Sequence, residues 1–371
     1  MLEIKEKDFN SFFNAPFNAY GERSPYVSPL KSDFKRILSN QNPLFKDQNT
    51  FTYFSAIKDG IPIGRVVTHV HNDSNKKYDW KRAYFGFFDC INDLDIAKHL
   101  FDKVENWASD NNYTEVIGNF NLTAMQQIGV MMSGFNNKPY TDQVFSPSHI
   151  ADLLHKLGYV NEFPMTTFEL DLRSIDPQIV LGEKQNRIIN EGKIQLKKFK
   201  KNRFNTLIED VRDCLNDGFA NNPMFVPLTK EEFLYQSRDM TTIIDENISV
   251  LAYDESGPIG VILCIPDLNP FIRANKSRLS VTTPFHFVKF KLKRDRAVII
   301  FYSVKQKYQN KGLNGVMLYK VLQALKIRGY KTLGITWISD QNKASLRQAE
   351  KLGCKQLHNL SLFKKHSIQE K

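Results

Sequence analysis

The stretch that decides the fold is AVIIFYSVKQKYQNKGLNGVMLYKVLQAL, which runs from Ala297 to Leu325. Its beginning, up to Val304, is rich in β-branched and aromatic residues, which predicts a buried strand. A polar segment with two glycines follows and ends at Gly315. From Val316 onwards apolar residues recur at helical spacing, and Gly329 is expected to end this helix. The stretch therefore predicts a strand, a tight turn and a helix.

The turn between this strand and this helix has the features of an anion site. The free N–H groups of a helix's first turn point out of its end, where the helix dipole favours negative charge. Nearby, Lys305, Lys307 and Lys311 would add positive charge. An ordinary turn with a helix-starting glycine would look the same, so both interpretations stay open at this point.

The next elements continue the alternation of strands and helices. A second strand is predicted from Thr332 to Ile338, and a second helix runs from about Asn342 to Leu352 and ends at Gly353. A last strand, Lys355 to Phe363, closes the series.

The order of residues around the turn resembles a known family. Gln309-x-x-Gly312-x-Asn314 is similar to the Q/R-x-x-G-x-G/A signature of the GNAT (GCN5-related N-acetyltransferase) superfamily. NKAS at 342–345 and EKLG at 350–353 resemble the family's downstream segment. The resemblance extends from about Ile248 to Phe363. It implies an α/β (α+β) fold, with a mixed, mainly antiparallel sheet flanked by helices.

The N-terminal half repeats landmarks of the C-terminal half. A Pro-Ile-Gly turn begins at Pro62 and again at Pro258, 196 residues later, and each lies in a predicted hairpin. A Leu-Gly pair between a helix and a strand begins at Leu157 and again at Leu352. Two matches at nearly one offset predict an internal duplication.

The duplication predicts tandem GNAT-like domains, as in a bacterial group of two-domain proteins of about 370 residues that the chain also resembles. The expected division is 1–175 for a degenerate domain with an insertion near 119–147, 176–192 for a connecting segment, and 193–371 for the domain with the acyl-CoA-type turn. The insertion, rich in amides and methionines, is either an irregular filler between domains or the wall of an acceptor pocket.

The first copy lacks the glycines of the turn. Its counterpart carries Asp89, Asp93 and Asp95, whose carboxylates would repel a pyrophosphate and cap the helix that begins at Leu94. The first domain is therefore expected not to bind CoA in this turn.

Composition narrows the class of protein. The 371 residues are 42% hydrophobic and 25% charged, as in globular proteins, and no apolar run is long enough to span a bilayer. Four scattered cysteines without metal-ligand spacing predict reduced thiols, a cytoplasmic location and no metal. No membrane partner is expected, and the oligomeric state is open.

The formal charge of +11 is concentrated in residues 197–203 and in residues 273–296, which hold eight Lys or Arg and one Asp. Such charge is either a solvated surface or an attraction for an anionic cofactor or substrate. Nucleic acid is an unfavoured partner because no nucleic-acid module is recognised.

The resemblance implies a CoA-dependent N-acyltransferase, in particular an acetyltransferase, that uses acetyl-CoA or another acyl-CoA as co-substrate. The acceptor would be a small-molecule or peptide amine. The residues that it implies for cofactor binding are Val304, Gln306, Gln309, Asn310, Lys311, Gly312, Leu313, Asn314, Gly315 and Asn342. Tyr302 is the nearest ionisable candidate for catalysis, and the alternative for it is a packed strand residue.

The chain departs from the family pattern at three places. Asn314 replaces the usual Gly or Ala, and Ala349 stands where many members carry a Tyr thought to protonate the leaving thiolate. The start of the central strand, Ala297 to Ile299, offers no acidic general base. Two other functions therefore stay open: a non-catalytic GNAT-like ligand-binding protein, and an aminoacyl-type transferase.

Overall fold

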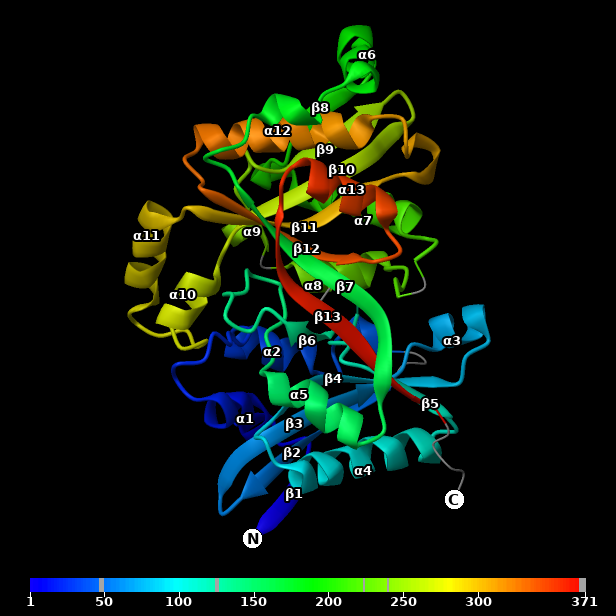
Figure 1. Cartoon of the computed structure of the whole chain (residues 1–371), viewed down its shortest axis with the longest axis vertical. Helices are drawn as coiled ribbons and strands as arrows, with labels where there is room; N and C mark the ends of the chain where they lie inside the picture. Colours follow the sequence, from blue (N-terminus) through cyan, green and yellow to red (C-terminus); the bar gives the residue numbers. More distant parts are fainter. Residues whose placement is uncertain (47–49, 124–126, 223, 239, 367–371) are drawn as a thin grey trace. The chain divides into compact units, whose positions relative to one another are not determined.

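The chain, seen in a computed structural model, is described for residues 1–46, 50–123, 127–222, 224–238 and 240–366 (Figure 1). It forms two compact units. Unit 1 comprises Met1–Thr166 and Leu357–Lys371, and unit 2 comprises Thr167–Gln356. The expected division near residues 175 and 193 into separate domains stays a prediction.

Unit 1 is built on a sheet that takes its last strands from distant parts of the sequence. The order is β1 (Leu2–Glu6), β2 (Phe51–Lys58), β3 (Ile61–His69), β4 (Arg82–Cys90), β5 (Glu115–Gly118), β13 (Lys355–His366) and β7 (Val160–Asp171), with β6 (Val130–Ser133) also paired to β13. The pairs from β1 to β4 are antiparallel, β4–β5 is parallel, and β5–β13 is antiparallel.

Helices cover both faces of this sheet. They are α1 (Phe9–Tyr20), α2 (Lys31–Ile37), α3 (Asn72–Tyr78), α4 (Leu94–Asp110) and α5 (Ser148–Lys156), with a 3-10 turn, η1, at Pro43–Phe45. Alternate strand residues face opposite sides. Thus Phe54 packs in a core with α4 and α5, whereas the neighbouring Tyr53 packs with α1 and α2.

The first 45 residues are regular although several prolines punctuate them. Helix α1 crosses this region with Pro16 inside it. The Asp8 carboxylate caps α1, and Phe12 and Phe13 are completely buried. Burial of these rings outweighs the cost of a proline within a helix.

Unit 2 repeats the strand order of unit 1. Its strands are β8 (Gln195–Lys198), β9 (Val250–Asp254), β10 (Gly257–Pro266), β11 (Arg296–Val304) and β12 (Thr332–Ser339), followed by the end of β7. All pairs from β8 to β11 are antiparallel, and β11–β12 is parallel. Gly260 faces Val304 as Gly64 faces Cys90 in unit 1. The internal repeat is thus present in topology and in register.

The helices of unit 2 are α6 (Glu183–Glu191), α7 (Phe204–Gly218), α8 (Lys230–Ser237), α9 (Met240–Ile243), α10 (Asn269–Ala274), α11 (Thr283–Lys293), α12 (Leu313–Ile327) and α13 (Lys343–Lys351), with 3-10 turns η2 (Pro177–Val180), η3 (Lys201–Arg203) and η4 (Gln306–Tyr308). They include α10 and α11, which lie between β10 and β11. The fold class is as expected: mixed, mostly antiparallel sheet flanked by helices.

The connecting segment expected at 176–192 contains η2 and α6, which are separate because the chain is extended at Gly182. Helix α8 ends at Ser237, and Asp239 lies outside the described residues. In the insertion, β6 is a strand, and residues 124–126 lie outside the described residues.

The described residues include no helix that is long and apolar enough to cross a membrane. In the same residues no group of three or more metal-ligating side chains could hold an ion. All four cysteines are free thiols, and burial raises the pKa of Cys214 and of Cys354 to about 12. These two thiols are therefore protonated at neutral pH.

Candidate functional site

The predicted strand, turn and helix are β11, η4 and α12. Gly312, with a φ of 100°, precedes α12, and no side chain caps the first turn of this helix. In unit 1 the corresponding helix α4 is capped by the Asp93 carboxylate, which accepts from the N–H groups of Asp95 and Ile96. The first-turn N–H groups of α12 therefore have no capping side chain, whereas two of those in α4 are taken by Asp93.

The end of β11 offers backbone groups next to this helix. The β11–β12 ladder runs from Arg296 to Ile299 on β11 and stops there. The Lys305 N–H donates to Ile259 of β10, so by alternation the backbone of Tyr302 and of Val304 faces away from β10. An extended amide chain could pair with β11 at this edge.

Two glutamines attach the turn to α7. The Gln306 N–H donates to the Asp217 carboxylate at 2.6 Å, and its side chain donates to the Asp217 carbonyl at 3.0 Å. The Gln309 side chain donates to the carbonyls of Val304 at 2.9 Å and Gly218 at 3.3 Å. Both glutamines thus hold the turn in place, and Asp217 already takes the Gln306 N–H that was expected to meet a cofactor.

The positive charge at the turn differs from expectation. Lys305 is paired with Asp213 at 2.5 Å, whereas Lys307 and Lys311 are exposed. A further cation, Lys184 of α6, donates to the Asn310 carbonyl at 3.4 Å. Lys184 lies 126 residues before Asn310, and no sequence pattern pointed to it.

Both glycines of the turn are also required by the chain itself. A Cβ at Gly312 would lie 3.0 Å from the Cβ of Lys184, and one at Gly315 would lie 2.9 Å from the Val180 carbonyl oxygen. The segment from η2 into α6 therefore packs against the first turn of α12. Leu313, between the glycines, is buried in the core of unit 2. The packing of the chain itself is therefore sufficient to require glycine at both positions.

Tyr302 bridges two helices. Its hydroxyl donates to the Asn314 carbonyl at 2.8 Å and accepts from the Gln348 side chain of α13 at 3.3 Å. Burial raises the pKa of Tyr302 far above its usual value, so the phenol stays protonated at neutral pH. Tyr302 can donate a hydrogen bond but is a poor general base.

Two more residues of the family pattern lie in α13. The Asn342 side-chain oxygen accepts from the Ser345 N–H at 3.1 Å and caps this helix, which leaves its amide N–H₂ free to donate. Ala349 is 2% exposed and packs against Phe168 and Ile338. The family's tyrosine is thus replaced here by a small core residue.

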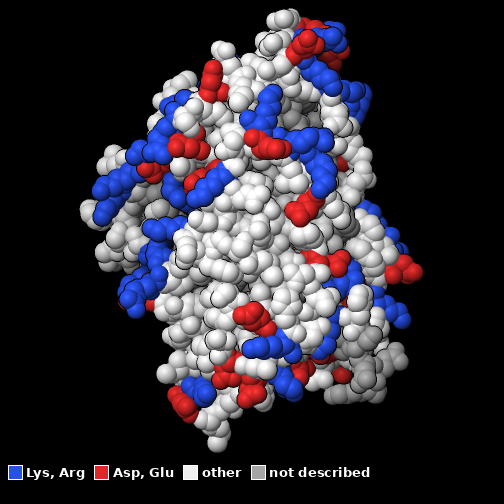
Figure 2. Space-filling view, viewed as in Figure 1, with Lys and Arg blue, Asp and Glu red and all other residues white. Residues whose placement is uncertain are grey.

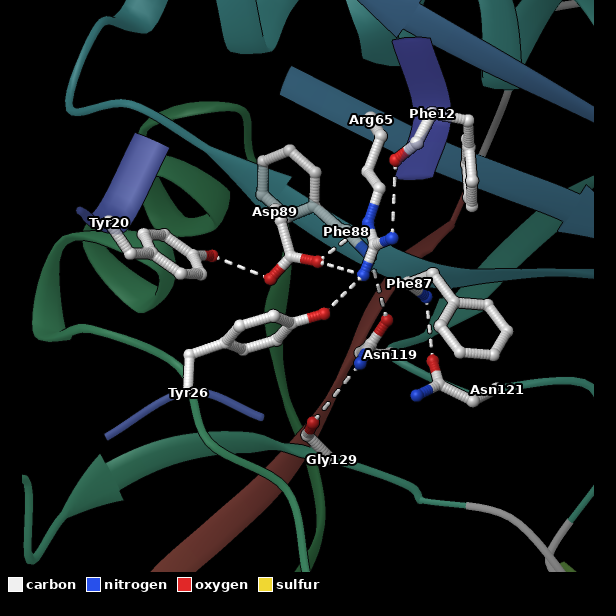
Figure 3. Close-up of polar contacts among 10 residues, drawn as sticks. All are labelled: Phe12, Tyr20, Tyr26, Arg65, Phe87, Phe88, Asp89, Asn119, Asn121 and Gly129. Atoms are coloured by element: carbon white, nitrogen blue, oxygen red, sulfur yellow. Dashed lines mark hydrogen bonds and ion pairs between the residues drawn. The ribbon is translucent and has the colours of Figure 1, made fainter. Parts of the chain in front are cut away.

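In unit 1 the counterpart of the open strand edge is filled by the chain itself (Figure 3). The β4–β5 ladder ends at Tyr84, and beyond it the Phe87 N–H donates to the Asn121 side chain at 2.6 Å. The Phe88 N–H donates to the Asn119 side chain at 3.1 Å. By register Phe88 corresponds to Tyr302, so in unit 1 two asparagines occupy the edge that β12 leaves unpaired in unit 2, where the Val304 carbonyl accepts from the Gln309 side chain.

Asp89 has a different role from the one expected. It lies in β4, not in the turn, and is 5% exposed. Its carboxylate accepts from Arg65 at 2.8 Å and from the Tyr20 hydroxyl at 2.6 Å (Figure 3). Only Asp93, with Asp95 in the first turn, acts at the start of α4.

Desolvation raises the pKa of Asp142, a partly exposed residue in the insertion of unit 1, from its usual value to about 7.

The contrast between the two units predicts where CoA changes hydrogen exchange. Addition of CoA is expected to slow exchange of the amides from Gly312 to Gly315, because phosphate oxygens would accept from them. The amides of Phe87 and Phe88, already bonded to asparagines, are expected to exchange equally with and without CoA. Protection confined to Phe87, Phe88 and Asp95 would contradict this assignment. The measurement is hydrogen–deuterium exchange read by mass spectrometry.

Comparison with known proteins agrees with this geometry. Residues 209–354, which include β11, the turn, α12 and α13, match the acetyltransferase (GNAT) family model. This segment belongs to the GNAT family. The resemblance inferred from the sequence is therefore confirmed for the part of the chain that holds the candidate site.

Two solved structures share the fold over nearly the whole of this chain. A tandem GNAT protein from the clavulanic acid biosynthesis pathway is 11% identical, with a TM-score of 0.59 over 99% of this chain and 98% of that one. A GCN5-related N-acetyltransferase from Sphaerobacter thermophilus is 13% identical, with a TM-score of 0.55 over 99% and 96%. The tandem neighbour supports a two-domain architecture.

Two curated relatives match over nearly their full lengths. Protein YghO of Escherichia coli is 22% identical in an alignment 371 positions long, which covers 98% of this chain and 94% of the relative. The bacterial ceramide synthase of Caulobacter vibrioides is 21% identical in an alignment 356 positions long, which covers 93% of this chain and 91% of the relative.

Proposed function

We propose that this protein is an acyl-CoA-dependent N-acyltransferase whose cofactor site lies in unit 2. The observation that carries the proposal is the uncapped start of α12 beside the end of β11 that does not pair with β12, within the GNAT segment. The pyrophosphate would bind the N–H groups from Gly312 to Gly315, with Lys311 and Lys184 adding charge-assisted contacts. The pantetheine amides would pair with the backbone of Tyr302 and Val304.

The reaction would transfer an acyl group between two nucleophiles. The lone pair of a neutral amine attacks the thioester carbonyl, a C–N bond forms, and the C–S bond then breaks to release the thiolate. A backbone N–H of β11 would stabilise the oxyanion of the intermediate. The amine loses a proton, and because Tyr302 stays protonated, this proton passes to water or to a carboxylate rather than to the phenol.

The relative named a ceramide synthase suggests the class of acceptor. A ceramide is the amide of a fatty acid with a long-chain amino alcohol. We therefore propose a long-chain amine as acceptor and a fatty acyl-CoA as donor, in preference to acetyl transfer to a small amine. The four free cysteines suit a reducing compartment, and we place the reaction in the cytoplasm.

A ligand series tests the donor and acceptor together. Melting temperature is measured with CoA, acetyl-CoA and fatty acyl-CoAs of increasing length, since a ligand that binds the native state raises it. Product formation is then followed by mass spectrometry with long-chain amino alcohols and with short amines. Stabilisation by acetyl-CoA alone, or acylation of short amines alone, would refute the lipid substrate.

Charge reversal at the turn tests the cofactor site. Lys311→Glu and Lys184→Glu are each expected to weaken CoA binding about tenfold or more, because a charge-assisted phosphate contact becomes a repulsion. Lys320→Glu, on the exposed side of α12, is the matched control and should leave the dissociation constant unchanged. Calorimetric titration measures all three.

Substitution of the turn glycine is a weaker test, and the structure shows why. Gly312→Glu would place a side chain against Lys184 at a positive φ, so a loss of binding could reflect strain. Asn314→Gly is more informative and is expected to preserve or tighten CoA binding. If wild type binds no CoA derivative, the cofactor assignment is wrong.

A non-catalytic ligand-binding protein is the second candidate, favoured by Ala349 and by the raised pKa of the partly buried Tyr302. One experimental result would distinguish this candidate from the acyltransferase. A non-catalytic protein would bind acyl-CoA with the same dependence on Lys311 but release no CoA in the presence of any amine.

A further inference from the structure

The segment between β10 and β11 forms an ordered helical hairpin. We call residues 269–294, with α10 and α11, the basic hairpin. The ring of Phe271 packs against those of Phe287 and Phe290, with centroids 5.5 and 6.0 Å apart. At the tip, the Ser280 N–H donates to the Thr283 hydroxyl at 2.8 Å. The hairpin thus has its own small apolar interior.

The outer face of the hairpin is apolar and exposed. Phe285, Val288 and Leu292 of α11 are 69%, 57% and 82% exposed, and Leu279 and Val281 at the tip are 58% and 98% exposed. In an α-helix the spacing of the first three places them within a sector of about 60°. Five of the twelve large apolar residues that are exposed in the described structure lie on this hairpin. Such a concentration indicates an interaction surface.

Positive charge surrounds this apolar face. Lys289 and Lys291 are exposed and lie on either side of the apolar sector of α11. Lys293, Lys276 and Arg278 are also exposed. Figure 2 shows Lys and Arg gathered over the region of α10 and α11, with few acidic groups among them. The single acid among residues 273–296, Asp295, is paired with Lys331.

We propose that the basic hairpin docks on an anionic lipid bilayer. The apolar side chains would enter the boundary between headgroups and acyl chains, and the lysines beside them would meet the anionic headgroups. The expectation of no membrane partner considered only spanning segments, whereas an interfacial helix needs no span. The proposal goes beyond the acyltransferase assignment and would hold without it.

The chemistry of this face favours a bilayer over other partners. Nucleic acid would match the lysines but leaves exposed phenylalanine and leucine without an apolar partner. A second copy of the chain would bring two strongly basic hairpins together, which like-charge repulsion opposes. A bilayer with anionic lipids satisfies both the apolar and the charged residues.

Vesicle co-sedimentation tests the proposal on the full-length protein. Binding is expected to vesicles of phosphatidylcholine with phosphatidylglycerol, and to be about tenfold weaker to phosphatidylcholine alone. The triple variant Phe285→Ser, Val288→Ser and Leu292→Ser should lose at least about tenfold in binding. Ile61→Ser with Ile327→Ser, two exposed isoleucines elsewhere, is the control and should bind like wild type.

A charge variant separates the two contributions. Replacing Lys289, Lys291 and Lys293 by glutamine should weaken binding and reduce its dependence on salt. The control replaces Lys197, Lys200 and Lys201, a second exposed basic run, and should change neither. The reporter Phe285→Trp should show emission shifted to the blue and quenching by brominated lipids only when vesicles are present.

Three results would overturn the proposal. The first is that the triple serine variant binds vesicles as well as wild type does. The second is that wild type does not bind vesicles and forms a dimer that the triple serine substitution dissociates. The third is that the protein binds nucleic acid but not vesicles. Binding of CoA by the triple variant is measured in parallel and should equal that of wild type. A failure of membrane docking is therefore distinguishable from a failure of the acyltransferase assignment.

Discussion

Removal of β13 is expected to unfold unit 1, although this strand is separated from the rest of that unit by the whole of unit 2. Residues Phe363–His366 pair with Gly118–Glu115 of β5, and Phe363 is completely buried in the core of unit 1. The Lys365 ammonium also pairs with the Glu105 carboxylate at 2.8 Å. Without β13, β5 would become an edge strand with an uncovered core beside it.

The measurement compares two truncations. A chain that ends at Gly353 lacks β13, whereas one that ends at His366 keeps every described residue and serves as control. Trp80 and Trp107 lie in unit 1 and Trp337 in unit 2, so a Trp337→Phe background reports on unit 1 alone. The shorter chain is expected to lose the cooperative urea transition of this signal. A normal transition, or a well-folded fragment of residues 1–175, would contradict the expectation.

A point substitution in β13 tests the same dependence of unit 1 on this strand and predicts the size of the change in the free energy of unfolding. Phe363→Ala is expected to lower the free energy of unfolding of unit 1 by about 3–5 kcal/mol, because it leaves a cavity in a closed core. Phe285→Ala, at a ring that is 69% exposed, is the matched control and should change the free energy of unfolding by less than about 0.5 kcal/mol.

Substitution of the buried carboxylate in Figure 3 is expected to have a similarly large effect. Arg65 is 1% exposed and lies over the rings of Phe12 and Phe34, at 4.9 and 5.1 Å from their centroids. Asp89 supplies the carboxylate that neutralises it. Asp89→Asn leaves the guanidinium buried without a counter-charge, which is expected to destabilise unit 1 by about 3–5 kcal/mol.

The neighbouring phenols do not relieve this loss. Burial raises the pKa of Tyr26 to about 12, and burial together with the Asp89 charge raises that of Tyr20. Both are therefore neutral at pH 7 and cannot replace the carboxylate. The double variant Arg65→Met with Asp89→Leu removes both charges and is expected to cost less than Asp89→Asn alone.

An exposed ion pair supplies the control for this prediction. Arg173 and Asp171 are 68% and 44% exposed and 2.7 Å apart. Asp171→Asn should therefore change the free energy of unfolding far less than Asp89→Asn does, since solvent screens such a pair. Equal effects of Asp89→Asn and Asp171→Asn in urea titrations would show that the buried pair contributes no more than a surface one.

Some features followed from the sequence alone because they depend on neighbouring residues. Apolar periodicity and the turn glycines between Ala297 and Leu325 are local, and the structure has a strand, a turn and a helix there. The repeated Pro-Ile-Gly and Leu-Gly pairs predicted the repeat of topology. The Asp93 cap was also predictable from the sequence, because its carboxylate accepts from the N–H of Asp95, which is only two residues away.

Other features were decided by contacts between residues far apart in the chain. The amides of Asn119 and Asn121 close the strand edge in unit 1, Lys184 reaches the turn in unit 2, and Asp217 takes the N–H of Gln306. The placement of Phe363 in the first unit depends in the same way on a partner strand some 245 residues earlier. No local pattern encodes such pairs, because any of several amides, lysines or strands could satisfy the same donor or cover the same core. Only the folded chain selects among them, through burial and hydrogen-bond geometry that exist once the units have formed.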